Sequence, residues 1–289
     1  MAEEGAPPPG AIRGGISTVV FGIVVVVVFV LAFFVGAFAS PALFPPAAPT
    51  LGDEIIVGTN TPFQPFEFRD EEGNLVGFTI DLVEEIGQRV GKTIVWSDYT
   101  DWTVLLEAGK QGSVNMIASS MTITAERDEV YDFSTSYYSA NQAALVHKDD
   151  TFTCPGKECT ADDVKDKTYA VQTGTTSHIW IKDNFNIDCS TTGPLFCFDD
   201  VTSVINKVKT KGADMAIMDL PAAVSFAADP ANEIKAVGKI FTNEQYGMAV
   251  QEGDPLGILP LINPVIQDLI DEGFIAQLEA DWGVPSEVP

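Results

Sequence analysis

Ile55-Ile56-Val57-Gly58-Thr59-Asn60 is a short apolar run that ends in a polar loop, and this arrangement recurs along the chain. Val114 to Ala118 runs into Ser119-Ser120, and Tyr169-Ala170-Val171 leads into a Gly-Thr-Thr loop. Between such runs lie segments with apolar residues at helical spacing, as from Thr79 to Val90. Short strands that alternate with amphipathic helices predict an α/β fold.

The same pattern predicts the remaining elements. Further strands are expected at Thr93–Trp96, Ala143–His147, Asp214–Met218 and Tyr246–Val250. Further helices are expected from the capping residue Asp101 to Gly109, from Ser203 to Lys211, and as a helical tail from Pro260 to Trp282.

Polar side chains that suit a ligand follow the ends of several strands: Asn60, Ser120, Thr122, Thr176 and Asp219. In open α/β sheets, ligands bind in crevices at the carboxyl ends of the strands. Two such sheets that face each other would enclose a small polar molecule. We therefore expect a binding cleft for such a molecule.

The composition excludes several classes of partner. The chain of 289 residues has 41 acidic and 16 basic side chains and a formal net charge of -25. Affinity for nucleic acid comes from Lys and Arg that neutralise phosphates, so no nucleic-acid partner is expected. No cofactor is expected. The chain also lacks the G-x-x-x-x-G-K-[ST] phosphate loop, so any ATP hydrolysis would take place on another chain. Two explanations of the acidity stay open: a source adapted to concentrated salt, or an acidic secreted protein.

The N-terminal part of the chain is predicted to be separate from the folded part. Residues 1–15 are a polar leader, expected in the cytoplasm, and residues 16–39 are an apolar run long enough to span a bilayer. Arg13 precedes this run and the first charges after it are acidic, which places the later residues outside the cell. A retained transmembrane anchor is favoured, and a signal segment cleaved near Ala39 is the alternative. Residues 40–51 are rich in proline and are expected to form a stiff tether.

All four cysteines lie between residues 154 and 197, outside the membrane on this topology. An oxidising exterior favours disulfides. Four cysteines allow three pairings, and the local pairs Cys154 with Cys159 and Cys189 with Cys197 are preferred. Zinc is the competing interpretation. It is disfavoured because neither spacing is of the C-x2-C type and no histidine sits beside the cysteines, so no metal site is expected.

A family resemblance rests on many short motifs in a fixed order. In the first half of the chain they are Gly58-Thr59-Asn60-Thr61-Pro62-Phe63-Gln64-Pro65-Phe66-Glu67-Phe68, Gly77-Phe78-Thr79-Ile80-Asp81-Leu82, Asp101-Trp102, Met121-Thr122-Ile123-Thr124-Ala125-Glu126-Arg127 and Tyr131-Asp132-Phe133-Ser134. In the second half they are Ala170 to Thr176, Ala213 to Asp219 and Gln245 to Val250. Over residues 52–284 the chain thereby resembles the polar amino-acid solute-binding proteins of ABC transporters (family 3), in the manner of glutamine-binding protein.

The resemblance implies a two-lobed periplasmic-binding-protein fold of type 2, with the ligand cleft between the lobes, preceded here by the N-terminal transmembrane helix. Lobe 1 would comprise residues 52–147 and, after the chain returns, residues 245–289 with the C-terminal helices. Lobe 2 would comprise residues 148–244. The chain would cross between the lobes near residues 144–147 and again near 245–248.

The resemblance also assigns residues to the two ends of a bound amino acid. Arg127 matches the arginine that binds the carboxylate, and a guanidinium supplies two donors in a fixed geometry. Thr122 would add a hydroxyl, and the backbone amide of Thr176 would add a donor from the other lobe. Asp219 matches the family's acceptor for the ammonium group, with the Ser120 carbonyl nearby.

Four further residues bear on the side chain of the ligand. Phe63 and Trp102 match the two aromatic residues that sandwich it, and plain core packing is the alternative for both. Asn60 stands where relatives often have an aspartate, which favours a neutral polar side chain over lysine or arginine. Gln172 replaces a lysine of the glutamine binder, which weakens the case for glutamine, and glutamate stays open.

Several candidates also have a structural interpretation. Arg127 alone would fit a solvated helix start, and Asp219 alone would fit a helix N-cap. Only the ordered motifs favour ligand roles for both. Asp81 is expected to brace its helix, and His147 and His178 are expected to be bystanders.

The expected function is capture of a polar amino acid by hinge closure and delivery to the permease subunits of an ABC transporter. The protein would be an extracytoplasmic monomer anchored to the outer face of the cell membrane. A pilin-like assembly through residues 13–39 is a further hypothesis, because Arg13 to Thr18 before the apolar run resembles archaeal pilin-type signals.

Two other classes of function compete with transport. One is the amino-acid-sensing domain of a receptor, which is disfavoured because little chain follows Trp282. The other is a cyclohexadienyl-dehydratase-like enzyme on the same fold. An enzyme is disfavoured because the sequence offers no Ser-His, Cys-His or paired-carboxylate arrangement.

Overall fold

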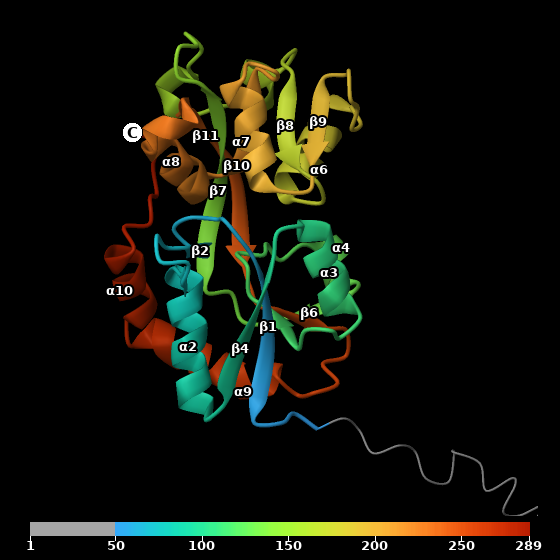
Figure 1. Cartoon of the computed structure of the whole chain (residues 1–289), viewed down its shortest axis with the longest axis vertical. Helices are drawn as coiled ribbons and strands as arrows, with labels where there is room; N and C mark the ends of the chain where they lie inside the picture. The colour runs from blue at the N-terminus through green and yellow to red at the C-terminus, as the bar shows by residue number, and fades with distance from the viewer. Residues whose placement is uncertain (1–49) are drawn as a thin grey trace, which may run out of the picture. The chain divides into compact units, whose positions relative to one another are not determined.

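Residues 50–289, the part of the chain that the computed structural model describes, contain two five-stranded sheets and a short hairpin. The first sheet has the strand order β4-β1-β5-β12-β6. Its strands are β1 (Glu54–Asn60), β4 (Thr93–Tyr99), β5 (Met116–Ile117), β6 (Tyr131–Phe133) and β12 (Ala249–Gln251). β1 runs parallel to β4 and β5, whereas β12 is antiparallel to β5 and β6. This sheet and the helices around it form the first lobe (Figure 1).

The helices of the first lobe are α2 (Phe78–Val90), α3 (Trp102–Lys110), α4 (Ala125–Asp128), α9 (Leu259–Asp271) and α10 (Phe274–Asp281). Asp101 caps α3 as predicted, and its side chain accepts from the N–H groups of Thr103 and Val104. Gly109 does not end α3, contrary to the prediction, because the helix continues to Lys110. Gly109 instead allows close packing, since a Cβ there would lie 2.4 Å from Ile117 Cδ1.

The second sheet has the order β11-β7-β10-β8-β9 and forms the second lobe. Its strands are β7 (Tyr138–His147), β8 (Tyr169–Gln172), β9 (Leu195–Phe198), β10 (Met215–Asp219) and β11 (Ile234–Tyr246). Around it lie α5 (Ala161–Val164), α6 (Thr176–Phe185), α7 (Val201–Lys209), α8 (Leu220–Ala228) and the short turns η1 (Pro155–Lys157) and η2 (Pro230–Asn232). The hairpin of β2 (Phe68–Arg69) and β3 (Leu75–Val76) belongs to the first lobe.

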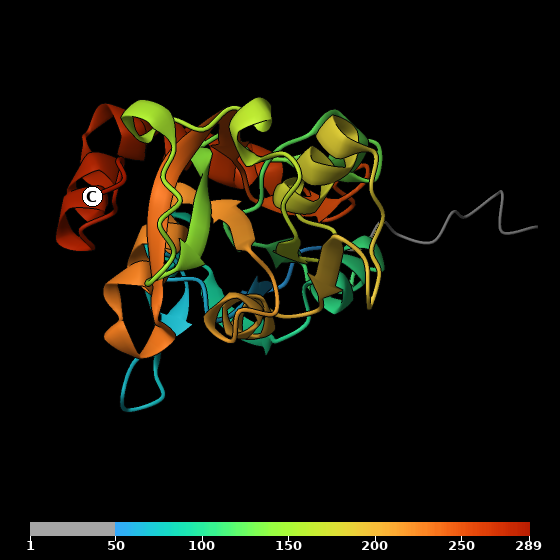
Figure 2. The ribbon, with the colours of Figure 1, turned by 90° about the horizontal axis from the view of Figure 1, so that it is seen from above.

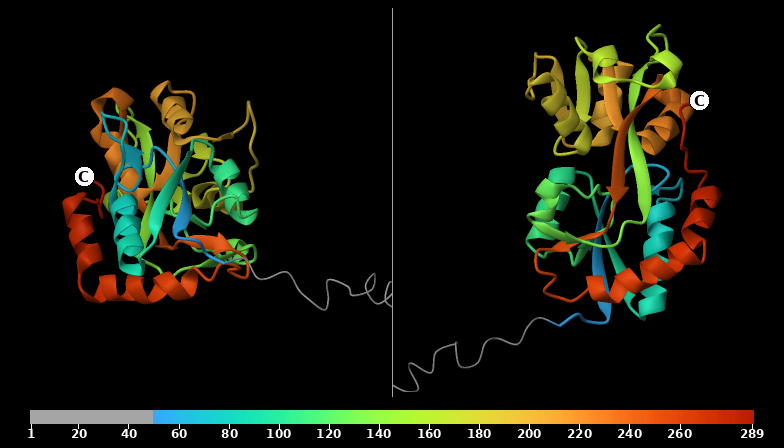
Figure 3. Two further views of the ribbon diagram at one scale, coloured as in Figure 1. Left: turned by 60° about the horizontal axis from the view of Figure 1, so that its bottom comes forward. Right: turned by 180° about the vertical axis from the view of Figure 1, so that it is seen from behind.

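The two long strands β7 and β11 carry the chain between the lobes (Figures 1 and 3). They are antiparallel, with Ile234 opposite His147 at one end and Tyr246 opposite Tyr138 at the other. β7 is already paired with β10 from Gln142, so the chain enters the second sheet a few residues before the predicted crossing near 144–147. On the return, β11 ends at Tyr246 and β12 of the first sheet begins at Ala249.

The C-terminal segment makes a third connection. The predicted helical tail is two helices, because Gly273 separates α9 from α10 with a φ of 77°. After α10 the chain passes back to the second lobe, and Val288 is buried with Phe226 and Ile234 in its core. Residues 245–289 are therefore not confined to the first lobe. The view from above in Figure 2 shows the C-terminal end of the chain, in dark red, at one side of the molecule.

The predictions for the N-terminal part fall outside the described residues. They comprise the leader 1–15, the anchor or signal segment 16–39, the pilin-like segment 13–39 and nearly all of the tether 40–51. From residue 50 to residue 289, no helix has both the length and the apolar character that crossing a bilayer requires.

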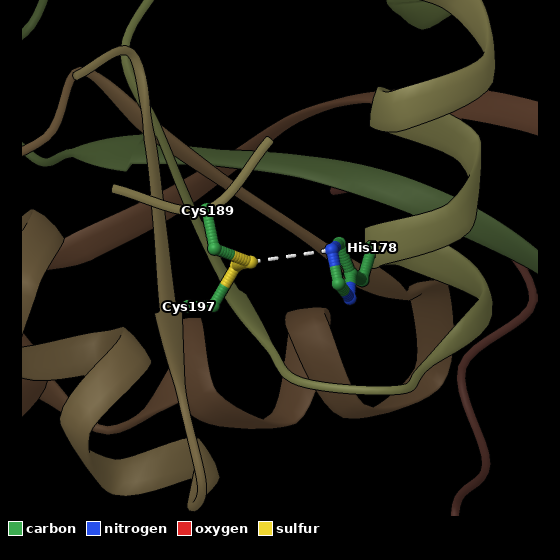
Figure 4. A group of neighbouring side chains, drawn as sticks. All are labelled: His178, Cys189 and Cys197. Carbon is green, nitrogen blue, oxygen red and sulfur yellow. Dashed lines mark hydrogen bonds between the residues drawn. A yellow bond between two sulfur atoms is a disulfide. The ribbon is translucent and has the colours of Figure 1, made fainter. Parts of the chain in front are cut away.

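The preferred local disulfides are both present. Cys154 is bonded to Cys159, and Cys189 is bonded to Cys197. The expectation that no histidine lies beside the cysteines is wrong, because His178 Nε2 lies 3.3 Å from Cys189 Sγ (Figure 4). His178 and this pair form the one cluster of metal-ligating side chains found among residues 50–289. Since both sulfur atoms are in a disulfide, they are not the thiolates that zinc binds.

Candidate functional site

A cavity lies between the two sheets, at the carboxyl ends of their strands. The residues that line it include all nine predicted site residues: Asn60, Phe63, Trp102, Ser120, Thr122, Arg127, Gln172, Thr176 and Asp219. The cavity is also lined by Glu67, Ser119, Thr175, Ser177, Val201, Val204, Ile217 and Met218. Residues from both lobes thus surround one space, as expected for polar residues that follow parallel strands.

Arg127 reaches the cavity from α4, a single helical turn capped by Thr124. Its Nη1 donates to the Thr122 carbonyl at 2.7 Å, and its Nη2 donates to the Gly174 carbonyl of the other lobe at 3.2 Å. The guanidinium carbon lies 5.6 Å from the centre of the Trp102 ring. Burial lowers the pKa of Arg127, yet an arginine stays charged. The side chain is therefore held in the site, and the solvated helix start is excluded.

Trp102 and Phe63 both line the cavity from the first lobe. Trp102 is buried, and its Nε1 donates to the Gly174 carbonyl at 3.3 Å. Phe63 packs against Phe66 with ring centres 6.3 Å apart and contacts the cores of both lobes. Trp102 also packs on the Arg127 guanidinium, as described above, and this contact was not predicted from the sequence.

Asp219 lies at the end of β10, just before α8. Its side chain does not cap that helix. Instead its carboxylate accepts from Gln142 Nε2 at 2.6 Å and from the Tyr246 hydroxyl through a short hydrogen bond. Burial, together with the nearby Glu244, raises the pKa of Asp219 to about 7. The N-cap interpretation therefore fails, and the carboxylate faces the cavity.

Asn60 and Gln172 meet across the cleft. Gln172 Nε2 donates to Asn60 Oδ1 at 3.1 Å and to the Asp199 carbonyl at 3.1 Å. Asn60 is fixed in turn, because its Nδ2 donates to the Tyr99 carbonyl at 2.7 Å and its backbone N–H donates to Ser119 Oγ at 2.9 Å. Together with the Trp102 and Arg127 contacts to Gly174, this contact shows that the lobes touch directly.

Thr175 and Thr176 bring the start of α6 to the cavity. Thr175 is the N-cap and accepts from the His178 N–H. The first N–H groups of a helix have no acceptor within the helix, so they suit an anion. His178 was expected to be a bystander, but its Nδ1 accepts from the Gly174 N–H at 3.2 Å and so fixes the loop that contacts Arg127.

Glu67 is a cavity residue that the sequence analysis did not select. It is 1% exposed and accepts from Ser119 Oγ at 3.3 Å and from Ser120 Oγ at 3.1 Å. Burial raises its pKa to about 8. Its position between Phe66 and Phe68 could have indicated a functional role. Burying a charged residue between two aromatic residues costs free energy unless the carboxylate has hydrogen-bonding partners.

Glu244 and Gln142 form a second buried polar group that was missed. Glu244, on β11, accepts from Thr122 Oγ1 at 2.5 Å, from Thr176 Oγ1 at 3.0 Å and from Gln142 Nε2 at 2.7 Å. Gln142, on β7, is fully buried. Both residues come from the crossing strands and lie behind the threonines that line the cavity.

Asp81 and His147 lie outside the cavity. Asp81 accepts from Trp282 Nε1 at 2.8 Å and so ties α2 to the end of α10. His147 Nδ1 accepts from the Asp149 N–H at 3.1 Å. Both therefore have the structural contacts expected of them.

The arrangement suits a zwitterion. Arg127 is the one cationic side chain among the described residues that line the cavity, and the N-terminus of α6 adds backbone donors. Asp219 and Glu67 supply buried acceptors, with Glu244 behind them. A guanidinium and carboxyl groups that line one cavity match a carboxylate and an ammonium on one carbon.

Comparison with known families gives one match that spans most of the chain. Residues 55–285 match the family described as bacterial extracellular solute-binding proteins, family 3. The L-cystine-binding protein TcyJ of Escherichia coli is 25% identical over 229 residues, which cover 79% of this chain and 82% of the relative. A probable histidine-binding protein of Campylobacter jejuni is 28% identical over 218 residues, which cover 75% of this chain and 80% of the relative.

Solved structures give the same fold. A mutant of the arginine-binding protein ArgBP from T. maritima has a TM-score of 0.71 at 33% identity and covers 81% of this chain and 96% of its own. An ancestral arginine-binding protein bound to glutamine has a TM-score of 0.71 at 29% identity, over 80% of this chain and 98% of its own. A third neighbour is AncCDT-1, described as an ancestral amino acid-binding protein and a precursor of cyclohexadienyl dehydratase. It has a TM-score of 0.68 at 30% identity and covers 80% of this chain and 95% of its own. The two-lobed periplasmic-binding-protein fold follows from these neighbours.

Proposed function

Because the chain belongs to the bacterial extracellular solute-binding proteins of family 3, we propose that it captures a polar amino acid outside the cytoplasm and delivers it to the permease of an ABC transporter. The observation that carries this proposal is the cavity between the lobes, where Arg127 and Asp219 line one space. Relatives named for cystine, histidine and arginine support it.

The proposed roles follow from charge. Arg127 binds the α-carboxylate, helped by the N–H groups at the start of α6, and Asp219 accepts from the α-ammonium. Each charge-assisted contact is worth about 1.5–3 kcal/mol when partly buried. Trp102 and Phe63 shield these contacts from water and pack on the ligand. Asn60 and Gln172 are placed to contact its side chain.

Glu67 changes the expected ligand. A neutral polar side chain was favoured because Asn60 lacks a charge, but Glu67 adds a carboxyl group to the same cavity. A protonated Glu67 donates to a carbonyl, and an ionised Glu67 binds a cation, so it accommodates both classes. We therefore propose a ligand whose side chain donates or accepts hydrogen bonds, with arginine, histidine and glutamine as the first candidates.

Capture by hinge closure is supported by the contacts between the lobes. We propose lobe 1 as residues 52–147 and 245–289 and lobe 2 as residues 148–244, with two corrections from the structure: the crossing strands β7 and β11 both belong to the second sheet, and the last residues, with Val288, pack in the core of lobe 2. The bond from Gln172 to Asn60 and the bonds from Arg127 and Trp102 to Gly174 join the lobes in this structure. They would break on opening, so that a ligand which bridges the lobes favours the closed form.

The N-terminal part extends the proposal to the cell surface. We propose that residues 16–39 hold the protein at the outer face of the membrane and that residues 40–51 act as a tether, with cleavage near Ala39 and pilin-like assembly as alternatives. Mass spectrometry of the protein from its native membrane decides between the first two, because cleavage removes the leader. Electron microscopy of shed filaments tests the third.

A screen of the twenty amino acids by thermal shift, on the full-length protein in detergent and at low and high salt, tests the function. A ligand present at a thousandfold its Kd stabilises the folded protein by about 4 kcal/mol. A shift with one or a few polar amino acids supports the proposal. A well-folded protein that responds to none of them contradicts it.

An enzyme on the same fold is the second candidate, and two observations favour it. The neighbour AncCDT-1 is described as a precursor of a dehydratase, and two cavity carboxyl groups, Glu67 and Asp219, have raised pKa values. Groups that hold a proton near neutral pH are suited to acid catalysis. Recovery of the bound amino acid unchanged, by mass spectrometry after a long incubation, would reject this candidate.

A further inference from the structure

Glu244 lies directly behind two residues that line the cavity. Its Oε2 accepts from the Thr122 hydroxyl of the first lobe at 2.5 Å and from the Thr176 hydroxyl of the second lobe at 3.0 Å. Its Oε1 accepts from Gln142 Nε2 at 2.7 Å. The side chain is 6% exposed, and three donors converge on it. Such a set of donors is what an ionised carboxylate requires in a buried place.

The orientation of Gln142 follows from its two acidic neighbours, because carboxylate oxygens of Glu244 and Asp219 need a donor and the amide NH2 supplies two hydrogens. The Ser177 hydroxyl, which can donate or accept, then donates to Gln142 Oε1 at 2.7 Å. The two hydrogens of that Nε2 are directed at Glu244 and at Asp219, where the distances are 2.7 Å and 2.6 Å. Its distance to Thr176 Oγ1 is longer, at 3.1 Å. Gln142 therefore serves the two carboxylates and leaves the Thr176 hydroxyl hydrogen to Glu244.

The number of hydrogens then decides what the threonines offer to a ligand. A hydroxyl has one hydrogen and two lone pairs. When Thr122 and Thr176 donate their hydrogens to Glu244, only lone pairs remain for the cavity. A carboxylate has no hydrogen to give to such oxygens, whereas an ammonium group has three.

We propose that Glu244 is a positioning residue that turns the hydroxyls of Thr122 and Thr176 into hydrogen-bond acceptors, so that they bind the ligand's ammonium group together with Asp219. The proposal rests on the proposed function and changes one expectation from the sequence, which assigned the Thr122 hydroxyl to the ligand's carboxylate. The Thr122 hydroxyl contacts the ammonium group and not the carboxylate, which is left to Arg127 and the N–H groups of α6. Because Glu244 touches one hydroxyl from each lobe, the ammonium subsite is complete only when the lobes are closed.

The substitution Glu244→Gln reverses this polarity with little change in shape. The glutamine oxygen has to face Gln142 Nε2, because two NH2 groups repel each other there. Its own NH2 then donates to Thr122 and Thr176, whose hydroxyl hydrogens are released towards the cavity. The variant should therefore discriminate against an ammonium group.

The experiment compares ligands with and without the α-amino group on the full-length protein in detergent. The probes are arginine, histidine and glutamine, each paired with its analogue that lacks the α-amino group, and Kd is measured by calorimetry. In Glu244→Gln we expect Kd for the amino acid to rise about tenfold or more, with less than about a twofold rise for the deaminated analogue. Equal weakening of both members of a pair would overturn the proposal, because a merely structural role acts on both.

Two further variants complete the test. Glu252→Gln removes one exposed negative charge away from the cavity and should leave every Kd unchanged. Thr122→Val keeps the shape of Glu244's neighbour but removes its lone pairs, so it should reproduce the selective loss even if Glu244→Gln folds poorly. If Thr122→Val weakens the deaminated analogue as much as the amino acid, the hydroxyl serves the carboxylate and the proposal is wrong. If the wild type binds none of the three amino acids, the proposed function itself fails first.

Discussion

Arg127 is the residue on which the proposed amino-acid site depends most directly. Its guanidinium is held by the carbonyls of Thr122 and Gly174 and stacks on Trp102, so its remaining N–H groups have a fixed direction. Lysine keeps the charge but cannot reproduce two parallel donors. We therefore expect Arg127→Lys to raise Kd for the bound amino acid by about tenfold to hundredfold in calorimetry. Arg89→Lys is the matched control, because Arg89 pairs with Glu85 and Glu272 on the surface and should leave Kd unchanged.

Glu67 should make the ligand-free protein less stable as pH rises. Burial raises its pKa to about 8, so the folded protein keeps this carboxyl protonated where the unfolded chain ionises it. The stabilisation is complete below about pH 4.5 and is lost as pH rises towards about pH 8. Asp219 acts in the same direction, with a pKa raised to about 7.

Glutamine resembles a protonated glutamate, so Glu67→Gln should flatten this decline. We expect a smaller fall in Tm between about pH 5 and about pH 8 in Glu67→Gln than in the wild type. Glu71→Gln, at an exposed position nearby, should keep the wild-type slope. A slope in Glu67→Gln equal to that of the wild type would show that Glu67 is ionised in the folded protein.

At the residue scale, the sequence predicted those cavity residues whose chemistry is visible locally. Asn60 and Asp219 end their strands and Ser120 and Thr176 come a few residues after theirs, and the backbone geometry of parallel strands brings such positions together. Glu67 and Glu244 were missed for a physical reason. A carboxylate within a strand or beside aromatics is significant only when buried, and burial depends on residues more than fifty positions away in sequence.

At the scale of elements, β11 is the largest omission. Thirteen residues long, it was not predicted, because Lys235, Gly238, Lys239 and Asn243 interrupt any apolar alternation. The strand forms nonetheless, since one side pairs along β7 with shifts in register at Ala236 to Gly238 and at Ile240 to Glu244. Tertiary pairing therefore overrides local composition here. The shorter strands β1, β8 and β10 were predicted because each contains an uninterrupted apolar run of three or four residues.

Gly238 on β11 gives a prediction for this element. A Cβ at this position would lie 2.3 Å from Cys159 Sγ and 2.7 Å from Cys154 Cβ, and a disulfide has little freedom to move away. We expect Gly238→Ala to lower the free energy of unfolding by about 1–3 kcal/mol in urea titrations. Gly52→Ala is the control, because nothing lies within 4 Å of its Cβ. Equal stabilities of the two variants would mean that the disulfide and β11 do not pack as described.

At the scale of the whole molecule, three segments join the lobes. β7 and β11 are paired along their length, and the C-terminal segment ends with Val288 in the core of the second lobe. Lys239 Nζ adds an ion pair with Glu287 at 2.7 Å. Two crossings were predicted from the sequence and the third was not. A single buried valine forms no periodic apolar pattern from which a contact could be predicted. Any opening of the cleft must therefore bend this segment or release it.

The charge of the molecule predicts how its stability responds to salt. The formal net charge of -25 makes the compact state repel itself more than the expanded unfolded chain does. Salt screens this repulsion, since the Debye length falls from about 10 Å at 0.1 M to about 3 Å at 1 M. At neutral pH, we expect the Tm of the ligand-free protein to rise by more than about 5 °C over that range of NaCl.

A general salting-out effect would also raise Tm, and pH separates the two causes. The calculated isoelectric point is about 4.1, so near that pH the net charge and its repulsion vanish while salting-out remains. If the rise measured at neutral pH shrinks severalfold near pH 4, self-repulsion is its source and a salt-adapted surface is supported. If the rise is the same at both pH values, the acidic surface has no such role, and the alternative of an ordinary acidic secreted protein gains the support.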